Sequence, residues 1–258
     1  MLTDHPTLLL VGNRFSGFSA AHPEVLTVSE FIRHLRNDAG APRPEHLTLQ
    51  PGQGIGESQW DLLRLEIAER GLSHRIHLLP ALPAPAGRHE THKHLEVNRL
   101  IASPRMTGPG RYRADLRVHN DNELLIDHQT GQHVQGMVAV EAARQMFLTV
   151  TERFLLPDDR ERYFVINSLD TEFENFLFPL AAEIDYRIVE SDTADPDRLS
   201  FTVEIGIEQA GRRCTRTEVR FTAFENRLIE SKEQRRAEKA LAAVVERREG
   251  AYADAAVH

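Results

Sequence analysis

Residues 127–145 run Asp-His-Gln-Thr-Gly-Gln-His-Val-Gln-Gly-Met-Val-Ala-Val-Glu-Ala-Ala-Arg-Gln, and the fold of the chain is most clearly indicated here. A polar loop with two histidines leads into a segment that is apolar on almost every side of a helix, as expected for a helix buried in a core. The helix nevertheless places Glu141 and Arg144 three residues apart, on one face and near its start. Because an unpaired buried charge is costly, this pair is either bridged or used in chemistry.

Further ionisable groups precede this helix. Asp127, His128 and His133 lie in the loop, and an imidazole can transfer a proton near neutral pH. The sequence therefore predicts a chemical site at the start of the helix, with Glu141 and Arg144 as the other members. The structural alternative is a Glu141–Arg144 salt bridge within the helix and histidines that only hydrogen-bond the loop.

Composition excludes several classes of protein. The chain has 258 residues, enough for one large domain or two modest ones. Its net charge of -8 and pI of about 5.9 argue against a nucleic-acid binder, which needs a basic surface. The apolar run Leu8–Val11 is too short for a signal peptide or a membrane span, so we expect a cytoplasmic protein without a membrane partner.

No metal or redox centre is predicted. The single cysteine, Cys214, falls in a strand-like stretch and is expected to be a small buried residue. His89, His92 and His94 are close in sequence, but their spacing puts them on different faces of a strand or loop. We expect no metal site and no cofactor.

Residues 1–80 predict a small Rossmann-like α/β domain. Expected strands cover Thr7–Val11, His46–Leu49 and His74–Leu79, and two amphipathic helices lie between them, one over Glu57–Arg70. A strand-to-helix turn with the spacing GxGxG occupies residues 52–56. This spacing differs from the dinucleotide-binding pattern and follows the second strand, which favours a structural turn over a nucleotide site.

A proline-rich linker at residues 81–92 separates this unit from an α+β domain at 93–226, and a charged helix and tail follow at 227–258. Around the long helix, which starts at Gly136, we expect an antiparallel sheet. The expected extended segments are 111–118, 123–126, 163–167, 171–178, 182–190, 199–209 and 212–224. Two arginine sets could dock an acidic partner, although a solvated strand face is the favoured interpretation; they are Arg111, Arg113 and Arg117, and Arg212, Arg213, Arg216 and Arg220.

The pentad Glu141–Gln145, with the preceding Asp127-His128 and His133, resembles the A-factor biosynthesis (AfsA-type) hotdog domain. The likeness covers roughly residues 93–226 and extends more distantly to the hotdog acyl-carrier-protein dehydratases. It implies a hotdog fold, in which a curved antiparallel sheet wraps one buried helix.

The resemblance implies an enzyme of specialised metabolism that acts on a thioester of an acyl carrier protein or of coenzyme A. The AfsA-type reaction joins a β-ketoacyl thioester to the hydroxyl of a glycerol-type phosphate. By resemblance, Glu141 is the candidate base and Arg144 contacts a phosphate or an oxyanion. Gly136 would let the thioester carbonyl approach the first N–H groups of the helix, and Asn175 and Phe176 would contact the substrate. Such proteins usually carry two hotdog repeats, so a single repeat implies a homodimer.

Two other functions remain open. Dehydration of a β-hydroxyacyl thioester needs a loop histidine, but the position fourteen residues before Glu141, where dehydratases carry it, is Asp127. His128 follows that position, and His133 is the other candidate; thioesterase action is a further enzymatic possibility. The alternative of a different class is a non-catalytic acyl-binding or docking protein.

Overall fold

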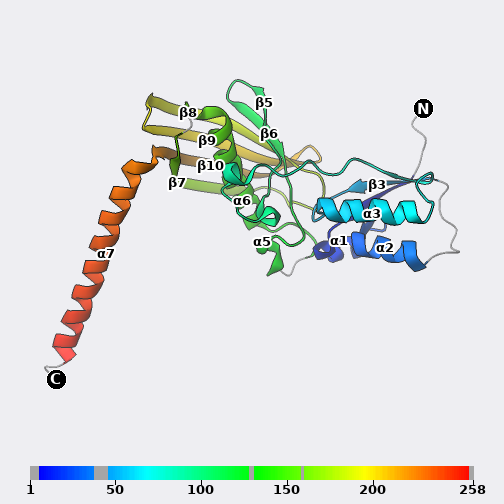
Figure 1. Cartoon of the computed structure of the whole chain (residues 1–258), viewed down its shortest axis with the longest axis horizontal. Helices are drawn as coiled ribbons and strands as arrows, with labels where there is room; N and C mark the ends of the chain where they lie inside the picture. Colours follow the sequence, from blue (N-terminus) through cyan, green and yellow to red (C-terminus); the bar gives the residue numbers. More distant parts are fainter. Residues whose placement is uncertain (1–5, 38–45, 128–130, 158–159, 256–258) are drawn as a thin grey trace.

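The computed structural model describes residues 6–37, 46–127, 131–157 and 160–255. The amino-terminal part is a parallel sheet with the strand order β2-β1-β3-β4, covered by helices (Figure 1). Its strands are β1 (Thr7–Val11), β2 (Val25–Thr27), β3 (Leu47–Pro51) and β4 (Ile76–Leu78). Its helices are the short η1 (Asn13–Phe15), α1 (Ser16–Ala21), α2 (Val28–Asn37) and α3 (Glu57–Glu69).

The three strands expected in this unit correspond to β1, β3 and β4, and the helix expected at Glu57–Arg70 corresponds to α3. Strand β2 and helix α1 were not expected, because three and six residues are too few to establish a period. The Rossmann-like character of this unit and the domain boundaries stay predictions.

The second part contains the long buried helix and a six-stranded antiparallel sheet with the order β5-β6-β8-β9-β10-β7. Its strands are β5 (Arg105–Gly108), β6 (Arg111–Asp115), β7 (Arg162–Phe173), β8 (Glu183–Asp195), β9 (Arg198–Gln209) and β10 (Arg212–Glu225). Its helices are α4 (Arg88–Thr91), η2 (Glu96–Asn98), α5 (Glu123–Ile126), α6 (Gly136–Val150), the π-helical turn η3 (Thr151–Leu155) and α7 (Asn226–Ala255).

Helix α6 lies against one face of this sheet and is buried along most of its length (Figure 1). Alanines 139, 142 and 143 let the helix approach the strands closely, while larger side chains fill the space between. One of these, Phe147, stacks on Phe221 of β10 with ring centroids 4.5 Å apart. The predicted combination of a long buried helix and an antiparallel sheet is therefore confirmed.

Two local predictions were wrong. Residues 123–126 form α5 instead of an extended segment, because Asn122 caps the turn and its side chain accepts a hydrogen bond from Leu124 N. The two strands expected at 163–167 and 171–178 are replaced by one strand, β7, whose pairing with β10 continues through a register shift at Arg220/Phe221. This strand ends at Phe173, so residues 174–178 lie outside it.

The glycine-rich turn after β3 joins the two units. Gln53 is fully buried, and its Nε2 donates to the carbonyls of Leu116 (3.1 Å) and Leu180 (3.2 Å). Its Oε1 accepts from Val118 N at 2.8 Å, and Gly54 N donates to the Val118 carbonyl. Gly54 has φ +84, and the neighbouring loops leave no space for a side chain there. The turn therefore packs the parallel sheet onto the antiparallel one.

Helix α7 projects away from the rest of the chain, at the end opposite the parallel sheet (Figure 1). It contacts β10 and β7, and apolar side chains farther along the helix, such as Leu241, are exposed. No helix in the described residues is long and apolar enough to cross a membrane.

Candidate functional site

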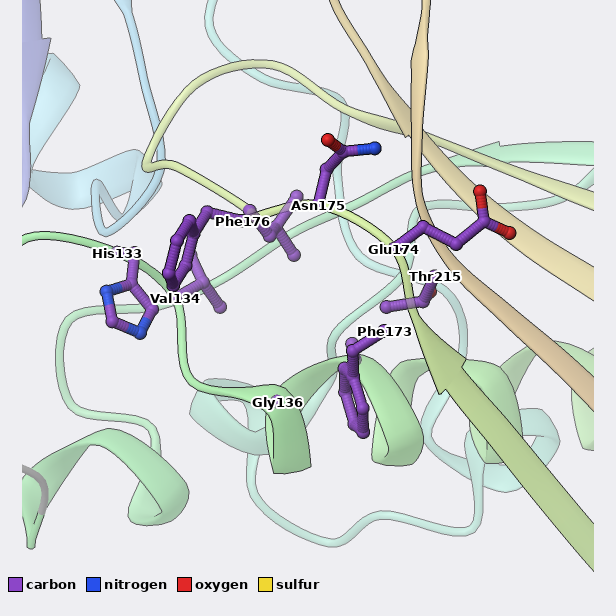
Figure 2. Close-up of a pocket in the computed structure, with 10 residues that line it drawn as sticks. His133, Val134, Gly136, Phe173, Glu174, Asn175, Phe176 and Thr215 are labelled. Carbon is purple, nitrogen blue, oxygen red and sulfur yellow. The ribbon is translucent and has the colours of Figure 1, made fainter.

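The amino end of α6 borders a pocket of about 530 Å³ (Figure 2). Helix α6 and the loop before it form one wall; the end of β7, the segment that follows it and β10 form the other. Most of the lining is apolar or aromatic, which suits an acyl chain. The lining residues are His133, Val134, Gly136, Ala139, Phe173, Glu174, Asn175, Phe176, Leu177 and Thr215.

A backbone hydrogen bond holds the two walls together. Val134 N donates to the Leu177 carbonyl at 2.7 Å, so the loop before α6 is fixed to the segment after β7. Within the second wall, the Asn175 side chain links the segment after β7 to β10, because its Nδ2 donates to the Arg213 carbonyl at 2.7 Å. The bond between Val134 and Leu177 places the start of α6 beside the end of β7, two segments that are separated in the sequence by the whole helix.

Gly136 lies in close contact with the ring of Phe173. A Cβ atom at position 136 would lie 2.7 Å from Cε1 of Phe173, closer than such contacts occur. Figure 2 shows the Phe173 ring beside the first turns of α6, while the side chains of Glu174 and Asn175 point away from the helix. The first N–H groups of α6 therefore lie next to an aromatic wall.

Four predicted residues line this one pocket: His133, Gly136, Asn175 and Phe176. The His133 ring contacts the Phe176 ring, with centroids 5.0 Å apart. Asp127 is exposed at the end of α5 and is absent from the pocket lining. His128 lies outside the described residues.

Glu141 and Arg144 lie on a different side of α6. The Glu141 Oε1 atom accepts from Arg144 Nη1 at 3.2 Å and from Gln145 Nε2 at 3.1 Å. Lys93 Nζ lies 2.9 Å from the same oxygen. Gln145 is itself fixed, since its Oε1 accepts from Leu100 N at 2.7 Å and its Nε2 also donates to the Asn98 carbonyl. Three donors therefore hold one oxygen of Glu141 in place.

A second, smaller cavity of about 180 Å³ lies beside this carboxylate. Glu141, Lys93 and Asn98 line its polar side, and Met137 and Val140 its apolar side. Among the described residues, every hydrogen bond and ion pair of the Glu141 carboxylate uses Oε1. The Oε2 atom remains available as an acceptor for a ligand.

The structure therefore separates two groups of residues that the sequence suggested as a single site. His133 lines the larger pocket and Glu141 the smaller one, and the contacts of Glu141 in the described residues include no histidine. Within one chain the described side chains form an acyl-sized pocket and a separate anchored carboxylate.

Lys93 and Thr215 border these cavities but were not expected there from the sequence. Lys93 lies in the histidine-rich segment considered only for metal binding; in the described ranges no group of three or more His, Cys, Asp or Glu could hold a metal. His92 instead pairs with Glu152 at 3.1 Å. Thr215 faces the pocket because a register shift between Arg213 and Thr215 changes the alternation of β10, which the sequence pattern does not reveal.

The arginines considered for partner docking divide into two kinds. Arg113 pairs with Asp185, and Arg216 with Glu204, across neighbouring strands, as expected for a solvated sheet face. Arg117 differs, because burial lowers the pKa of its guanidinium and it lies beyond the end of β6. Cys214 is buried, and burial raises the pKa of its thiol, which agrees with a packing role.

A long helix lying on an antiparallel sheet, with a pocket at the amino end of the helix, defines a hotdog-type domain. The A-factor biosynthesis hotdog domain matches residues 76–225, and the chain belongs to this family. No curated protein matches the sequence.

Solved structures similar to this chain share little sequence with it. AziG of S. sahachiroi is 22% identical, with a TM-score of 0.35 over 47% of this chain and 90% of that chain. A thioesterase mutant from Pseudomonas aeruginosa is 13% identical, with a TM-score of 0.37 over 48% and 81%. A thioesterase mutant from Staphylococcus aureus is 10% identical, with a TM-score of 0.37 over 47% and 92%.

Proposed function

We propose that this protein acts on an acyl thioester, carried by an acyl carrier protein or by coenzyme A, and transfers the acyl group to a hydroxyl acceptor. The supporting observation is the apolar pocket of about 530 Å³ at the amino end of the buried helix α6. Its Phe173 and Phe176 walls suit an acyl chain, and the start of the helix suits a carbonyl oxygen.

The thioester carbonyl would lie against the first N–H groups of α6, where Gly136 has no side chain to block it. In the reaction the acceptor hydroxyl adds to the carbonyl carbon and gives its proton to a base. The carbon–sulfur bond then breaks, and the thiol leaves with a proton. The helix N–H groups would stabilise the negative charge that develops on the carbonyl oxygen.

Glu141 is the proposed base and Arg144 the proposed anion partner, as the family resemblance implies. The three donors on Oε1 leave Oε2 to accept the hydroxyl proton. Within one chain, Glu141 lines a different cavity from the acyl pocket. We therefore propose that a second copy completes the site, so that the pocket of one copy faces Glu141 of the other.

The edge strand β7 supports this arrangement. It is the last strand in the sheet, so one side of its backbone is unpaired. Apolar side chains along it are exposed, including Ile166 and Phe173, and Phe176 just beyond it is 69% exposed. A homodimer that pairs along β7 would cover these side chains and bring the second copy next to the pocket.

Dehydration of a β-hydroxyacyl thioester is the second candidate, because His133 lies in the pocket and an imidazole can remove the α-proton. In that reaction the hydroxyl leaves as water and a carbon–carbon double bond forms. A non-catalytic acyl-binding protein would use the same pocket with neither His133 nor Glu141 required.

Intact mass spectrometry of a loaded carrier protein distinguishes these functions. A β-ketoacyl carrier mixed with a glycerol-type phosphate should lose its acyl group with wild type and keep it with Glu141→Gln. Loss of one water from a β-hydroxyacyl carrier, abolished in His133→Ala, would instead establish dehydration. A carrier that binds the protein but is unchanged in every mixture would overturn both reactions in favour of acyl binding.

A further inference from the structure

A third cavity lies where the two units meet, away from α6. It measures about 360 Å³ and is bounded by the start of α3, by Pro85 of the linker and by the residues that follow β6. Gly52 packs against the backbone of Pro179 and Gly54 against that of Gly12, so neither glycine borders this cavity. Only Gly56, the last glycine of the turn, borders it.

Arg117 is the least expected residue in this cavity. Its side chain is partly buried, and the Nε atom is fully buried without a hydrogen-bond partner in the described residues. No described residue forms a hydrogen bond or ion pair with this guanidinium; Glu57, Glu96 and Asp115 act on it only at longer range. A partly buried guanidinium without a close partner is energetically costly unless another group, such as the anion of a ligand, pairs with it.

Three further donors surround the same space. His119 Nδ1 accepts from Asp121 N at 3.0 Å, so the neutral ring carries its proton on Nε2. That Nε2 atom lies 2.7 Å from the position of a Cβ at residue 56, directly at the amino end of α3. The hydroxyl of Ser58 and the first N–H groups of α3 line the same end.

Two of the three carboxylates that line the cavity form ion pairs with arginines. Glu96 pairs with Arg99 at 2.6 Å, and Asp61 pairs with Arg64. Glu57 has no such partner among the described residues and can accept hydrogen bonds from hydroxyl groups. The cavity therefore offers an anion-binding end at Arg117 and a hydroxyl-binding side at Glu57.

From this arrangement we infer that the junction cavity binds a small phosphate ester that also carries hydroxyl groups. The phosphate would pair with Arg117 and the amino end of α3, and the hydroxyls with Glu57. Because this cavity lies between the units, a bound ligand would also link the parallel sheet to the antiparallel one. The site is independent of the acyl pocket and of the function proposed for it.

Isothermal titration calorimetry of the intact chain with inorganic phosphate tests the anion end. Wild type should show saturable binding, and Arg117→Met should weaken it about tenfold or more, the effect of losing one charged hydrogen bond. Arg113→Met removes an arginine of the sheet face and should bind as wild type does. Arg117→Lys keeps the charge and should recover part of the affinity, which guards against a folding defect in the methionine variant.

Ribose 5-phosphate tests the hydroxyl side. It should bind more tightly than inorganic phosphate to wild type, and Glu57→Gln should remove that difference while leaving inorganic phosphate binding intact. The inference is overturned if wild type shows no saturable heat with either probe, or if Arg117→Met and wild type bind phosphate equally.

Discussion

The ammonium group of Lys93 lies 2.9 Å from Oε1 of Glu141, although the two residues come from opposite sides of β5 and β6 in the sequence. The segment between the linker and β5 therefore returns to the long helix and supplies one of the three donors that hold its carboxylate. Within the helix alone, Arg144 and Gln145 are the only predictable partners of Glu141, because they lie one turn away.

Lys93→Gln is expected to lower the free energy of unfolding by about 1 kcal/mol, because both groups of the ion pair are partly withdrawn from solvent. Urea unfolding of this variant, of Glu141→Gln and of the double variant would give the coupling energy. Lys93→Arg should retain most of the stability. Strictly additive single effects would show that the two side chains do not interact in solution.

Gln53→Leu is expected to cost roughly 3 kcal/mol, because it removes three hydrogen bonds and leaves Val118 N and the Leu116 carbonyl buried without a partner. The midpoint of urea denaturation measures this loss. Gln50→Leu, an exposed position on β3, is the matched control and should change stability by less than about 0.5 kcal/mol. Equal effects at both positions would mean that Gln53 does not join the units.

Gly136→Ala should weaken binding of a long-chain acyl thioester while leaving the fold intact. The new methyl group meets the Phe173 ring, which is exposed enough to move, so the collision alters the pocket and spares the core. The double variant Gly136→Ala with Phe173→Ala relieves the collision and should regain part of the affinity. Calorimetry with a non-hydrolysable acyl-CoA analogue measures both, and unchanged affinity in the single variant would place the acyl chain elsewhere.

The thiol of Cys214 should resist Ellman's reagent in the folded chain at pH 8 and react fully in urea, because it is buried. Burial raises its pKa, so the unfolded chain loses the thiol proton at a lower pH than the folded chain does. The free energy of unfolding should therefore fall as pH rises above the ordinary thiol pKa of about 8.5. Cys214→Ala should remove that component of the pH dependence, and rapid labelling of the native chain would contradict the burial.

Local pattern predicted much of the fold. The helix at 136–150 is indicated by apolar residues on nearly every side of a helix. The strands β8, β9 and β10 are indicated by alternation of Val, Ile, Thr and Phe with polar residues. The residue pattern gave the wrong structure where a single hydrogen bond sets the conformation. Residues 123–126 have the composition of a strand, but the cap formed by Asn122 makes them helical.

The candidate site was only partly predictable. His133, Gly136, Asn175 and Phe176 were singled out from the sequence and line one pocket, whereas Glu141 and Arg144 lie beside another. Sequence spacing places residues along a helix, but it does not state which side of the helix faces a cavity. That depends on how the preceding loop is fixed, here by the bond between Val134 and Leu177.

The buried helix, the long antiparallel strands and the family could all be read from the amino-acid sequence, because they depend on residue periods and on a short motif. Which ionisable groups contact one another depends on the folded chain. Lys93 reaches Glu141, and Gln53 joins the sheets, through contacts between segments far apart in the chain. Arg117 has no close partner in the described part of the chain for the same reason, since its surroundings come from the linker and from α3. Charge pairing acts over a few ångströms of space, and only the folded chain sets those distances.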